Sequence, residues 1–519
     1  MTHLRPPGLG PIVGHTTATS TRLWIRGDDG SDDRTVGVAA LFRKNHKRPL
    51  NVSYFRLRRE YDRTGCVDFT DLEADTQYRA VFGTLLMQTE DPHDVTRTDE
   101  LFKLLPDPKA WLDELASLPE DESVARFSTQ SDAEGGPLSF LFGSCRYPGI
   151  FAQQSKLGDR IFRAILDRVY TAAGPARFFL MIGDQIYADL YSRHIGVLRA
   201  DTFEEFQERY RSAFETPNMR QLMRSLPTYM ILDDHEIEDN WHQSRIHIPE
   251  KRLLFNTAIA SYRSYQWIHS PRNYGDRLYY DYECQGYPFF VLDVRTQRVS
   301  TETKFEDNHL LGYPAKDSPF PKKSKDGEFP RYPGQIDQLC RWLIAAQERR
   351  GDRAKFIVSP GVFVPNTVEN AHDPRAGDSW SAFPATRRTL LATIVEHSIQ
   401  NVVFLCGDVH CSIVAEMSFH SKGGTLPIKA YSVTSSAFYW PFPFSDGDPN
   451  TFVHNSALEN DDFEFGEYTM RYRCSVFEQE DNFTRIDVDD TALTVSIIDR
   501  KGELRSKDPD GDYSARLVF

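Results

Sequence analysis

The chain has 519 residues, of which 26% are charged and 13% aromatic, and its formal net charge is -14. This length allows two or three domains, and the acidic balance argues against a general nucleic-acid binder, because phosphate backbones attract basic surfaces. No apolar stretch approaches the roughly 20 residues of a membrane span. The seven cysteines contain no CxxC pair, and residues 1–14 contain neither an apolar leader nor a twin-arginine pair. We therefore expect a cytoplasmic protein.

The first 104 residues are predicted to form an N-terminal β-sandwich domain. Short β-branched and aromatic runs alternate there with polar turns, as in TRLWIRG, RTVGVAALF, NVSYFRLR and QYRAVFGTLL. The stretch DLEADTQYRAVF resembles a corner of fibronectin type III (immunoglobulin-like) sandwiches, in which a buried tyrosine hydrogen-bonds back to the backbone. An exposed hairpin is the alternative. Residues 105–136 are polar and acidic, and they are interpreted as a connecting segment with a short helix at DPKAWLDELASL.

Residues 137–519 are predicted to form one α/β domain. Helical patterns alternate there with apolar strands, as in KLGDRIFRAILDRVY, QIDQLCRWLIAAQERR before AKFIVSP, and TRRTLLATIVEHSI before NVVFLCGD. The chain returns to a β pattern at FTRIDVDD and ALTVSIIDRKGELR. Two regions, 300–334 and 436–470, are predicted to be irregular, and loops of that length are often lids or binding loops.

Four apolar runs in this domain break abruptly into Gly, Asp, Cys or His: PLSFLFGSC, RFFLMIGDQIY, PTYMILDDHEIEDN and NVVFLCGDVH. A fully buried strand has such a continuous apolar run, and α/β sheets bind ligands beyond the carboxyl ends of their strands. We therefore expect one rim to carry the thiol, carboxylate, phenol, amide and imidazole groups of Cys145, Asp184, Tyr187, Asp233, Asp234, His235, Asn240, Asp408 and His410. This set of groups suits a site for several metal ions.

The spacing in two of these motifs, GDQIY and GDVH, could place two ligands on one metal ion. Asp184 has two oxygens and can bridge two cations, while a phenolate from Tyr187 would favour Fe³⁺; a helix-capping Asp184 is the alternative. Asp408 and His410 are two positions apart, so an extended chain points them the same way. A structural histidine is the alternative there.

Cys145 has three interpretations. A tyrosine-phosphatase nucleophile would need an arginine six positions later, where the chain has Phe151. An inert buried thiol is the usual fate of cysteine, and a thiolate ligand to a soft or trivalent metal is the third possibility. The shared rim favours the metal ligand. Arg146, the next residue, is of a type suited to bidentate phosphate contact.

Taken together, the motifs GSC, GDQIYAD, LDDHEIEDNW, VLDVRTQR, CGDVH and DSWSAFPATR resemble the alkaline phosphatase D (PhoD-like) family, and GPIVGHTTATSTRLWIRG resembles its N-terminal domain. The resemblance implies a calcineurin-like α/β/β/α metallophosphatase sandwich that hydrolyses phosphate esters with Fe³⁺ and Ca²⁺, other divalent metals being alternatives. It implies a small phosphoester as the partner, with no nucleic-acid scaffold and no membrane.

The resemblance also implies roles for individual residues. The implied metal ligands are Cys145, Asp184, Tyr187, Asp234, Asp408 and His410. The implied catalytic residues are His235, Arg146 and Asn240, with Arg146, Arg295 and Arg298 binding substrate; plain salt bridges are equally open for Arg295 and Arg298. A metal-activated hydroxide would attack phosphorus in line, and His235 would protonate the leaving group.

Three other functions compete with an alkaline phosphatase. A phosphodiesterase or phospholipase on the same fold would use the same metals, and a dianionic monoester needs more positive charge than a diester. A non-catalytic metal-binding sensor would retain the fold without turnover. A cysteine hydrolase built on Cys145 would be inactivated by iodoacetamide without losing metal.

Overall fold

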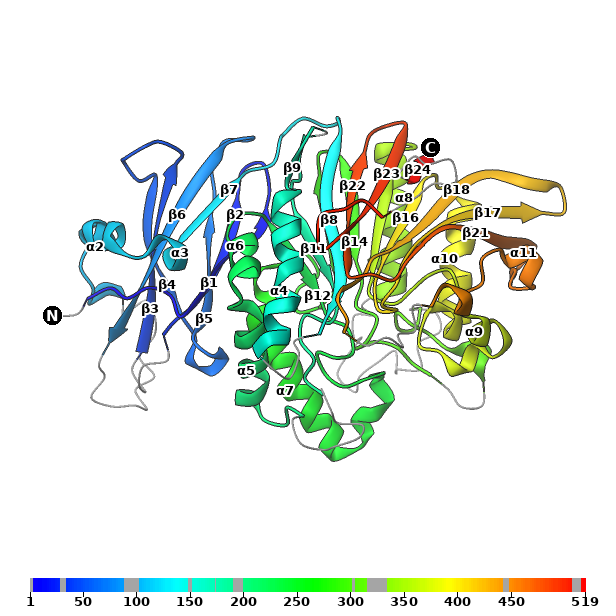
Figure 1. Cartoon of the computed structure of the whole chain (residues 1–519), viewed down its shortest axis with the longest axis horizontal. Coiled ribbons are helices and arrows are strands. Elements are labelled where there is room, and N and C mark those ends of the chain that lie inside the picture. The colour runs from blue at the N-terminus through cyan, green and yellow to red at the C-terminus, as the bar shows by residue number, and fades with distance from the viewer. Residues whose placement is uncertain are drawn as a thin grey trace, which may run out of the picture.

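A computed structural model describes residues 3–28, 34–87, 102–147, 152–172, 174–189, 199–300, 304–314, 334–441, 448–505 and 515–519. The chain is mixed α/β, with two small antiparallel sheets near the N-terminus and two large sheets in the remainder (Figure 1). A short antiparallel pair, β9 (Tyr170–Thr171) and β10 (Gly174–Pro175), forms a further two-stranded sheet. Among the described residues, no helix combines the length and apolar character that crossing a membrane requires.

The N-terminal part consists of two antiparallel sheets that share one apolar core. One sheet has the order β1-β2-β5 and the other the order β4-β3-β6-β7. Their strands are β1 (Leu9–Thr16), β2 (Thr21–Arg26), β3 (Arg34–Arg43), β4 (Asn51–Arg56), β5 (Thr64–Phe69), β6 (Gln77–Met87) and β7 (Val124–Ser128). Alternate side chains of both sheets meet in this core, including Leu23, Leu41 and Phe82. At the predicted corner, the backbone N–H of Glu73 donates to the Tyr78 hydroxyl at 2.8 Å.

The segment 105–136, expected to connect two domains, instead contributes to the N-terminal sheet. Strand β7 lies inside it and pairs antiparallel with β6. The expected helix at 107–118 is present as a 3-10 turn, η2 (Pro108–Trp111), followed by α2 (Leu112–Ser117), and α3 (Glu120–Ser123) leads directly into β7. The segment joins the N-terminal sheet because β7 buries Ala125 and Phe127 in the N-terminal core.

The first large sheet has the order β12-β11-β8-β22-β23-β24, with β19 also paired to β8. Strands β8, β11 and β12 run parallel, so their carboxyl ends meet at one edge. The strands are β8 (Leu138–Arg146), β11 (Phe179–Ile182), β12 (Thr228–Ile231), β19 (Ser436–Tyr439), β22 (Asn482–Val488), β23 (Ala492–Asp499) and β24 (Ala515–Val518). Its helices are α4 (Ala152–Asp167), α5 (Phe203–Phe214), α6 (Pro217–Met223) and α7 (Pro249–Tyr265), with η3 (Gln243–His247) and η4 (Trp267–His269) flanking α7.

The second large sheet has the order β13-β14-β15-β16-β18-β17-β21-β20. Strands β14, β15, β16 and β18 run parallel. The strands are β13 (Tyr280–Cys284), β14 (Tyr287–Val291), β15 (Lys355–Ser359), β16 (Val402–Cys406), β17 (Ser412–Ser421), β18 (Gly424–Thr434), β20 (Phe463–Phe465) and β21 (Tyr468–Glu478). Its helices are α8 (Gln335–Arg350), α9 (Val368–His372), α10 (Pro384–Glu396) and α11 (Ser456–Glu459).

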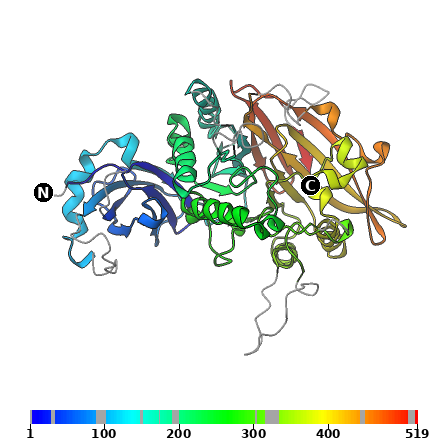
Figure 2. The same cartoon turned by 90° about the horizontal axis from the view of Figure 1, so that it is seen from below.

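The two large sheets face each other across a core of aromatic and branched side chains. Phe140 of the first sheet packs against Phe289 and Phe356 of the second, with ring centroids 5.4 and 5.3 Å apart. Side chains on the outer faces of the sheets pack against helices, with α4 to α7 on the first sheet and α8 and α10 on the second. The order of layers is therefore helices, sheet, sheet, helices, and both views show the sheets between the helices (Figures 1 and 2).

The region 436–470, predicted to be irregular, contains regular structure. It supplies β19, which pairs with β8, as well as α11, β20 and the start of β21. Mixed Pro, Gly and aromatic composition hid these short elements, and two of them, β19 and β21, pair with strands distant in sequence, β8 and β17. Residues 442–447, which include Phe442, lie outside the described residues, as does most of the predicted loop 300–334.

Candidate active site

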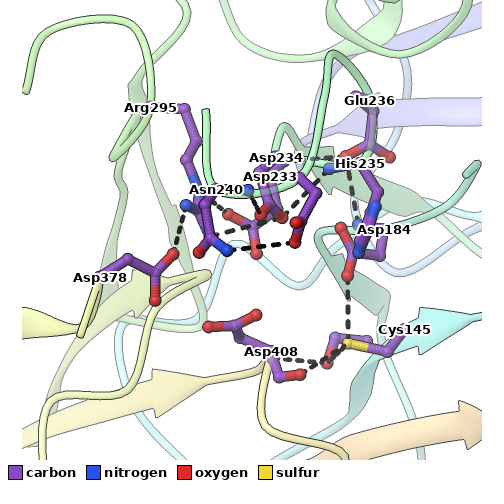
Figure 3. A network of polar contacts seen from close by, with 12 residues as sticks. Cys145, Asp184, Asp233, Asp234, His235, Glu236, Asn240, Arg295, Asp378 and Asp408 are labelled. Carbon is purple, nitrogen blue, oxygen red and sulfur yellow. Dashed lines mark hydrogen bonds and ion pairs between the residues drawn. The ribbon is translucent and has the colours of Figure 1, made fainter. Parts of the chain in front are cut away.

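The predicted site residues come from both large sheets rather than from one. Asp184, Asp234 and Cys145 follow or end strands of the first sheet, whereas Asp408 follows β16 and Arg295 follows β14 of the second. The sheets approach closely here, because a Cβ on Gly407 would lie 2.6 Å from Ser144 Oγ. Figure 3 shows Asp408 and Cys145 facing Asp184 and the acidic segment 233–240. The expected rim therefore exists, although two facing sheets build it.

The backbone leaves the strands in an uncommon conformation. The φ angle is positive at five predicted site residues, Cys145, Asp184, Asn240, Asp408 and His410. Such left-handed conformations cost energy in residues other than glycine and cluster at functional sites. Gly183, at φ +90°, is required for a second reason, since a Cβ there would lie 2.5 Å from Asp233 Cβ. The turns therefore point side chains toward the site that regular strands would direct elsewhere.

Two groups of ligand-type side chains meet in the space between these turns. One contains Asp184, Asp234 and His235, and the other contains Asp184, Asp233, Asp234 and Asp408. Within each group, one ligand atom per residue lies within 4.8 Å of all the others. Asp184 and Asp234 belong to both groups. The expectation that Asp184 could bridge two cations therefore has a matching geometry.

Cys145 and Tyr187 both reach Asp184. Cys145 Sγ lies 3.4 Å from Asp184 Oδ2, and the Tyr187 hydroxyl lies 3.4 Å from the same oxygen. Cys145 Sγ is also 3.5 Å from the carbonyl oxygen of Asp408. The thiol, the phenol and the carboxylate that sequence reasoning assigned to iron thus converge on one point.

The buried carboxylates of this cluster have too few cationic groups around them to offset their negative charge. Burial raises the pKa of Asp184 well above its usual value, and Asp233 and Asp234 add to the shift against the opposing charge of His235. Burial likewise raises the pKa of Asp408, and that of the Cys145 thiol. Asp184 Oδ1 and Asp233 Oδ2 are buried without a hydrogen-bond partner among the residues that the structure describes. Cations would satisfy these oxygens and let the acids ionise, so the donor set fits bound metal ions.

His235 is oriented by a buried carboxylate. Its Nδ1 lies 2.7 Å from Asp189 Oδ1, and the other Asp189 oxygen accepts the backbone N–H of Asp239 at 2.6 Å. Burial opposes protonation of the imidazole, but Asp189, Asp234 and Asp184 outweigh it and raise the pKa of His235 well above its usual value. Asp189 therefore fixes the orientation of the imidazole and favours its charged form.

Glu236 connects the two acidic turns through hydrogen bonds to their backbone. Its side chain is fully buried and accepts the backbone N–H groups of Asp184, Gln185 and Asp233 at 3.2, 2.7 and 2.8 Å. Gln266 Nε2 also lies within 3.4 Å of Glu236 Oε1. This carboxylate therefore fixes the positions of the turns that present the site residues.

Asn240 supports Asp234 through its backbone. The Asn240 N–H donates to Asp234 Oδ2 at 2.6 Å, and the His235 N–H donates to Asp234 Oδ1 at 3.1 Å. The Asn240 side-chain Nδ2 lies 3.2 Å from Asp239 Oδ1. Asn240 thus positions a predicted ligand, in addition to the ligand or substrate contact expected from its motif.

Arg295 lies among three acidic residues. Its Nε donates to Asp233, Nη1 donates to Asp378 Oδ2 at 2.6 Å, and Nη2 lies 3.5 Å from Asp234 Oδ1. Arg295 therefore forms salt bridges, which was one of its two interpretations.

Arg298 has fewer polar contacts than Arg295. Its Nη1 is 3.7 Å from Asp378, and its Nε is buried without a hydrogen-bond partner in the described ranges. Burial and the charge of Arg295 lower the pKa of Arg298 to about 10.

The prediction for Arg146 is wrong. Its guanidinium donates to the carbonyl oxygen of Ala213 and, at 2.8 Å, to Thr216 Oγ1, and it stacks over the Phe162 ring at 5.1 Å. The Arg146 side chain is therefore buried among α4, α5 and α6, behind β8, and is not available to a substrate.

His410 lies beside the cluster but outside both ligand groups. Its ring stacks on Trp440 with centroids 3.7 Å apart, and its backbone N–H donates to Ser436 Oγ at 3.0 Å. His410 Nε2 is buried and has no hydrogen-bond partner within the described part of the chain. An imidazole nitrogen in this state is available to a ligand.

Comparison with known proteins identifies the family. The sequence profile described as "PhoD-like phosphatase" matches residues 157–477, more than half of the chain. The chain belongs to the PhoD-like phosphatase family. It is 25% identical over 234 residues to alkaline phosphatase D of Bacillus subtilis (strain 168), a match that covers 41% of this chain and 36% of that protein. The matched region thus spans about a third of the relative's length.

The fold of PhoD is also present. The solved structure of PhoD superposes with a TM-score of 0.63 at 15% identity, covering 99% of this chain and 89% of the other. At that identity the likeness concerns the fold alone. The resemblance seen in the motifs is therefore confirmed at the level of family and fold.

Sequence reasoning missed two positions in this PhoD-like chain and left a third open. Asp189 ends the motif GDQIYAD, and Glu236 stands inside DDHEIEDN among several other acidic residues. Asp378 stands at the start of the motif DSWSAFPATR, where capping the following helix is the simpler interpretation of the sequence, although its carboxylate pairs with Arg295. The available signal was weak: an acid following a predicted ligand by a few residues is a candidate for orienting a histidine.

Proposed function

We propose that this chain is a metal-dependent phosphoester hydrolase. The observation that carries the proposal is the Asp184 carboxylate, which belongs to both ligand groups and receives Cys145 and Tyr187 on one oxygen. Membership of a phosphatase family supports the reaction class. A non-catalytic metal sensor has less support, because the ligands, the oriented imidazole and the strained turns are all retained.

The proposed cations are Fe³⁺ and Ca²⁺. A thiol and a phenol beside Asp184 suit a trivalent ion, whereas a group made only of carboxylates suits Ca²⁺. Cys145, Asp184 and Tyr187 would hold the first ion, with His410 as a further candidate, and Asp184, Asp234 and Asp408 would hold the second. Bound ions of this kind lower the pKa of a water molecule and neutralise developing charge on phosphoryl oxygens.

The chain's own residues supply the proton and orient the substrate. We assign His235 to protonating the leaving oxygen, because Asp189 keeps its imidazole charged and oriented. Arg298 is the candidate for contacting a non-bridging phosphate oxygen, since its Nε has no partner among the described residues. Asn240 would hold Asp234 in place and remains a candidate substrate contact. A small phosphoester is the proposed substrate.

A preference for diesters over monoesters follows from the arginines. Arg146 is turned away from the site, and the charge of Arg295 is balanced by Asp233 and Asp378. Among the described residues, Arg298 thus combines an unpartnered guanidinium nitrogen with a place beside the acidic cluster, where Arg146 does not lie. A dianionic monoester needs more positive charge than a monoanionic diester, so we propose phosphodiesterase activity as the principal one.

We further propose that residues 137–519 form the catalytic domain and that its layers are of the calcineurin-like α/β/β/α type. The order of helices and sheets supports this assignment. The two-sheet N-terminal part, with its Tyr78 corner, supports a fibronectin III-like sandwich. The pairing of β7 with β6 argues for extending that domain to residue 128.

The Asp184→Asn substitution tests the function. We expect loss of bound metal and a fall of about 100-fold or more in kcat/KM for p-nitrophenyl phosphate and its bis-ester, since even outer-shell partners of metal ligands are worth 10- to 100-fold. Elemental analysis and both assays provide the measurement, and the exposed Asp132→Asn serves as the control. Unchanged metal content and unchanged turnover in Asp184→Asn would contradict the proposal. A bis-ester to mono-ester ratio below one would contradict the diester preference.

A further inference from the structure

A second hollow lies between the N-terminal sheets and the helices of the first large sheet. It has a volume of about 410 Å³ and is bordered by β5, the end of α7 and η4. The N-terminal strands, drawn in blue, adjoin the green helices in both views (Figures 1 and 2). None of its lining residues belongs to the candidate active site. The lining carries two aspartates, Asp68 and Asp276, and five arginines, Arg22, Arg56, Arg58, Arg263 and Arg272.

The positive charge of this hollow is only partly neutralised. Arg22 forms a two-point ion pair with Asp68, at 2.7 and 3.1 Å, and exposed Arg56 lies 3.4 Å from Glu60. The other three guanidiniums, those of Arg58, Arg263 and Arg272, have no carboxylate partner in the described ranges. The chain as a whole has a net charge of -14. Counted against Asp68, Asp276 and the neighbouring Glu60, the five arginines leave a local excess of about two positive charges, which on such a protein calls for an anionic partner.

Two of these guanidiniums, those of Arg263 and Arg272, are held in place by an aromatic ring and by the backbone carbonyl oxygens of Asp276 and Ile268 rather than by carboxylates. Arg272 and Arg263 lie over the Trp267 ring at 4.7 and 5.5 Å from its centroid. Stacking of this kind leaves N–H groups free to bind oxygens. Arg263 Nε is buried and has no hydrogen-bond partner among the described residues. Burial, together with the charges of Arg22 and Arg58, lowers the pKa of Arg272, as expected for cations that repel one another.

We propose that this hollow binds a compact anion that carries two phosphate groups. A single phosphate group offers three acceptor oxygens, which is too few for bidentate contact with three guanidiniums that lack a carboxylate partner, whereas two groups offer six. The volume lies within the range of small-molecule pockets. The planar guanidinium fork favours phosphate oxygens over a simple halide. This site is separate from the proposed hydrolase site and stands independently of it.

The test uses methylenediphosphonate, a diphosphate analogue whose bridge resists hydrolysis, and isothermal titration calorimetry of the full chain as purified. Arg58 and Arg272 are exposed, so the double variant Arg58→Gln/Arg272→Gln should fold normally, which thermal unfolding checks. The matched control is Arg473→Gln/Arg516→Gln, two exposed arginines outside the hollow. We expect about tenfold or greater loss of affinity in the first double variant and no change in the second.

Three results would overturn the proposal. The first is equal binding in both double variants, and the second is the absence of saturable binding to the unmodified chain. The third is binding of sulfate as tight as that of the diphosphonate, which would remove the need for two phosphate groups. Asp184→Asn distinguishes this hollow from the active site. Methylenediphosphonate binding that survives the substitution supports the hollow as its site. Binding that is lost in Asp184→Asn but not in Arg58→Gln/Arg272→Gln would assign the ligand to the metal site.

Discussion

The Asp189→Asn substitution tests how the imidazole of His235 is held. Asp189 is 3% exposed and serves two donors, one oxygen for His235 Nδ1 at 2.7 Å and the other for the Asp239 N–H at 2.6 Å. An asparagine has one oxygen and one amide group. If that oxygen remains on the Asp239 N–H, the amide faces Nδ1, which can then no longer carry a proton.

The magnitude follows from these contacts. The charge-assisted bond to the imidazole is worth about 1.5–3 kcal/mol, and general acid catalysis contributes about 10²- to 10⁴-fold. We therefore expect kcat for a diester with an alkoxide leaving group, which must be protonated as it departs, to fall by about 100-fold or more. The free energy of unfolding should fall by about 1–2 kcal/mol because a charge-assisted hydrogen bond is replaced by a neutral one. Metal content should not change, since Asp189 is in neither ligand group.

The assay measures kcat, metal content and urea unfolding on one preparation. Asp201→Asn is the matched control, because exposed Asp201 pairs with Arg199 at 2.8 Å and contacts no site residue. A variant that retains full metal content and a kcat within a few-fold of the unmodified enzyme would refute the assignment of His235 as the proton donor. Loss of metal from Asp189→Asn would instead indicate that the carboxylate shapes the metal site itself.

Two further substitutions test the electrostatics of the fold. Arg295→Met removes the cation beside buried Asp233, so in chelator-treated protein the free energy of unfolding in urea should fall by about 3–5 kcal/mol. The control Arg388→Met, which removes a surface ion pair, should cost at most about 1 kcal/mol. Equal losses in the two variants would contradict the buried ion pair as the cause. Burial and the charge of Arg22 lower the pKa of His15 to about 4. Because the unfolded state then binds the proton more tightly, the free energy of unfolding should fall by at most about 3 kcal/mol as the pH drops from 6.5 to 4. His15→Gln should flatten that fall, and an unchanged profile would exclude His15 as its cause.

The sequence predicted the ends of the strands well because each apolar run had to break where the chain turns. Asp184 and Tyr187 converge as their motif suggested, since the turn after β11 brings residues three apart together. The division of these strands between two sheets was not predictable. Local patterns identify a buried strand, but strand order depends on contacts between distant segments, such as Thr484 of β22 with Phe142 of β8.

The errors have physical reasons too. Arg146 was assigned from its neighbour Cys145, but its guanidinium finds its partners at Ala213 and Thr216, in a distant segment that a local pattern does not reveal. Glu236 could not be distinguished from the acids around it, because its role depends on accepting backbone N–H groups from two separate turns. Charge density in a sequence marks a region, but only the folded backbone distinguishes an acid that binds a ligand from one that holds the turn.

The aromatic layer between the two large sheets has a consequence for metal selection. Because the candidate ligands are attached to opposite sheets, the thickness of the layer formed by Phe140, Phe289 and Phe356 sets the gap that an ion must fill. A smaller ring in this layer would let the sheets settle closer, and a bulkier one would spread them. Ion size preference in such an enzyme would then be tunable from its hydrophobic centre, by substitutions that never touch a ligand.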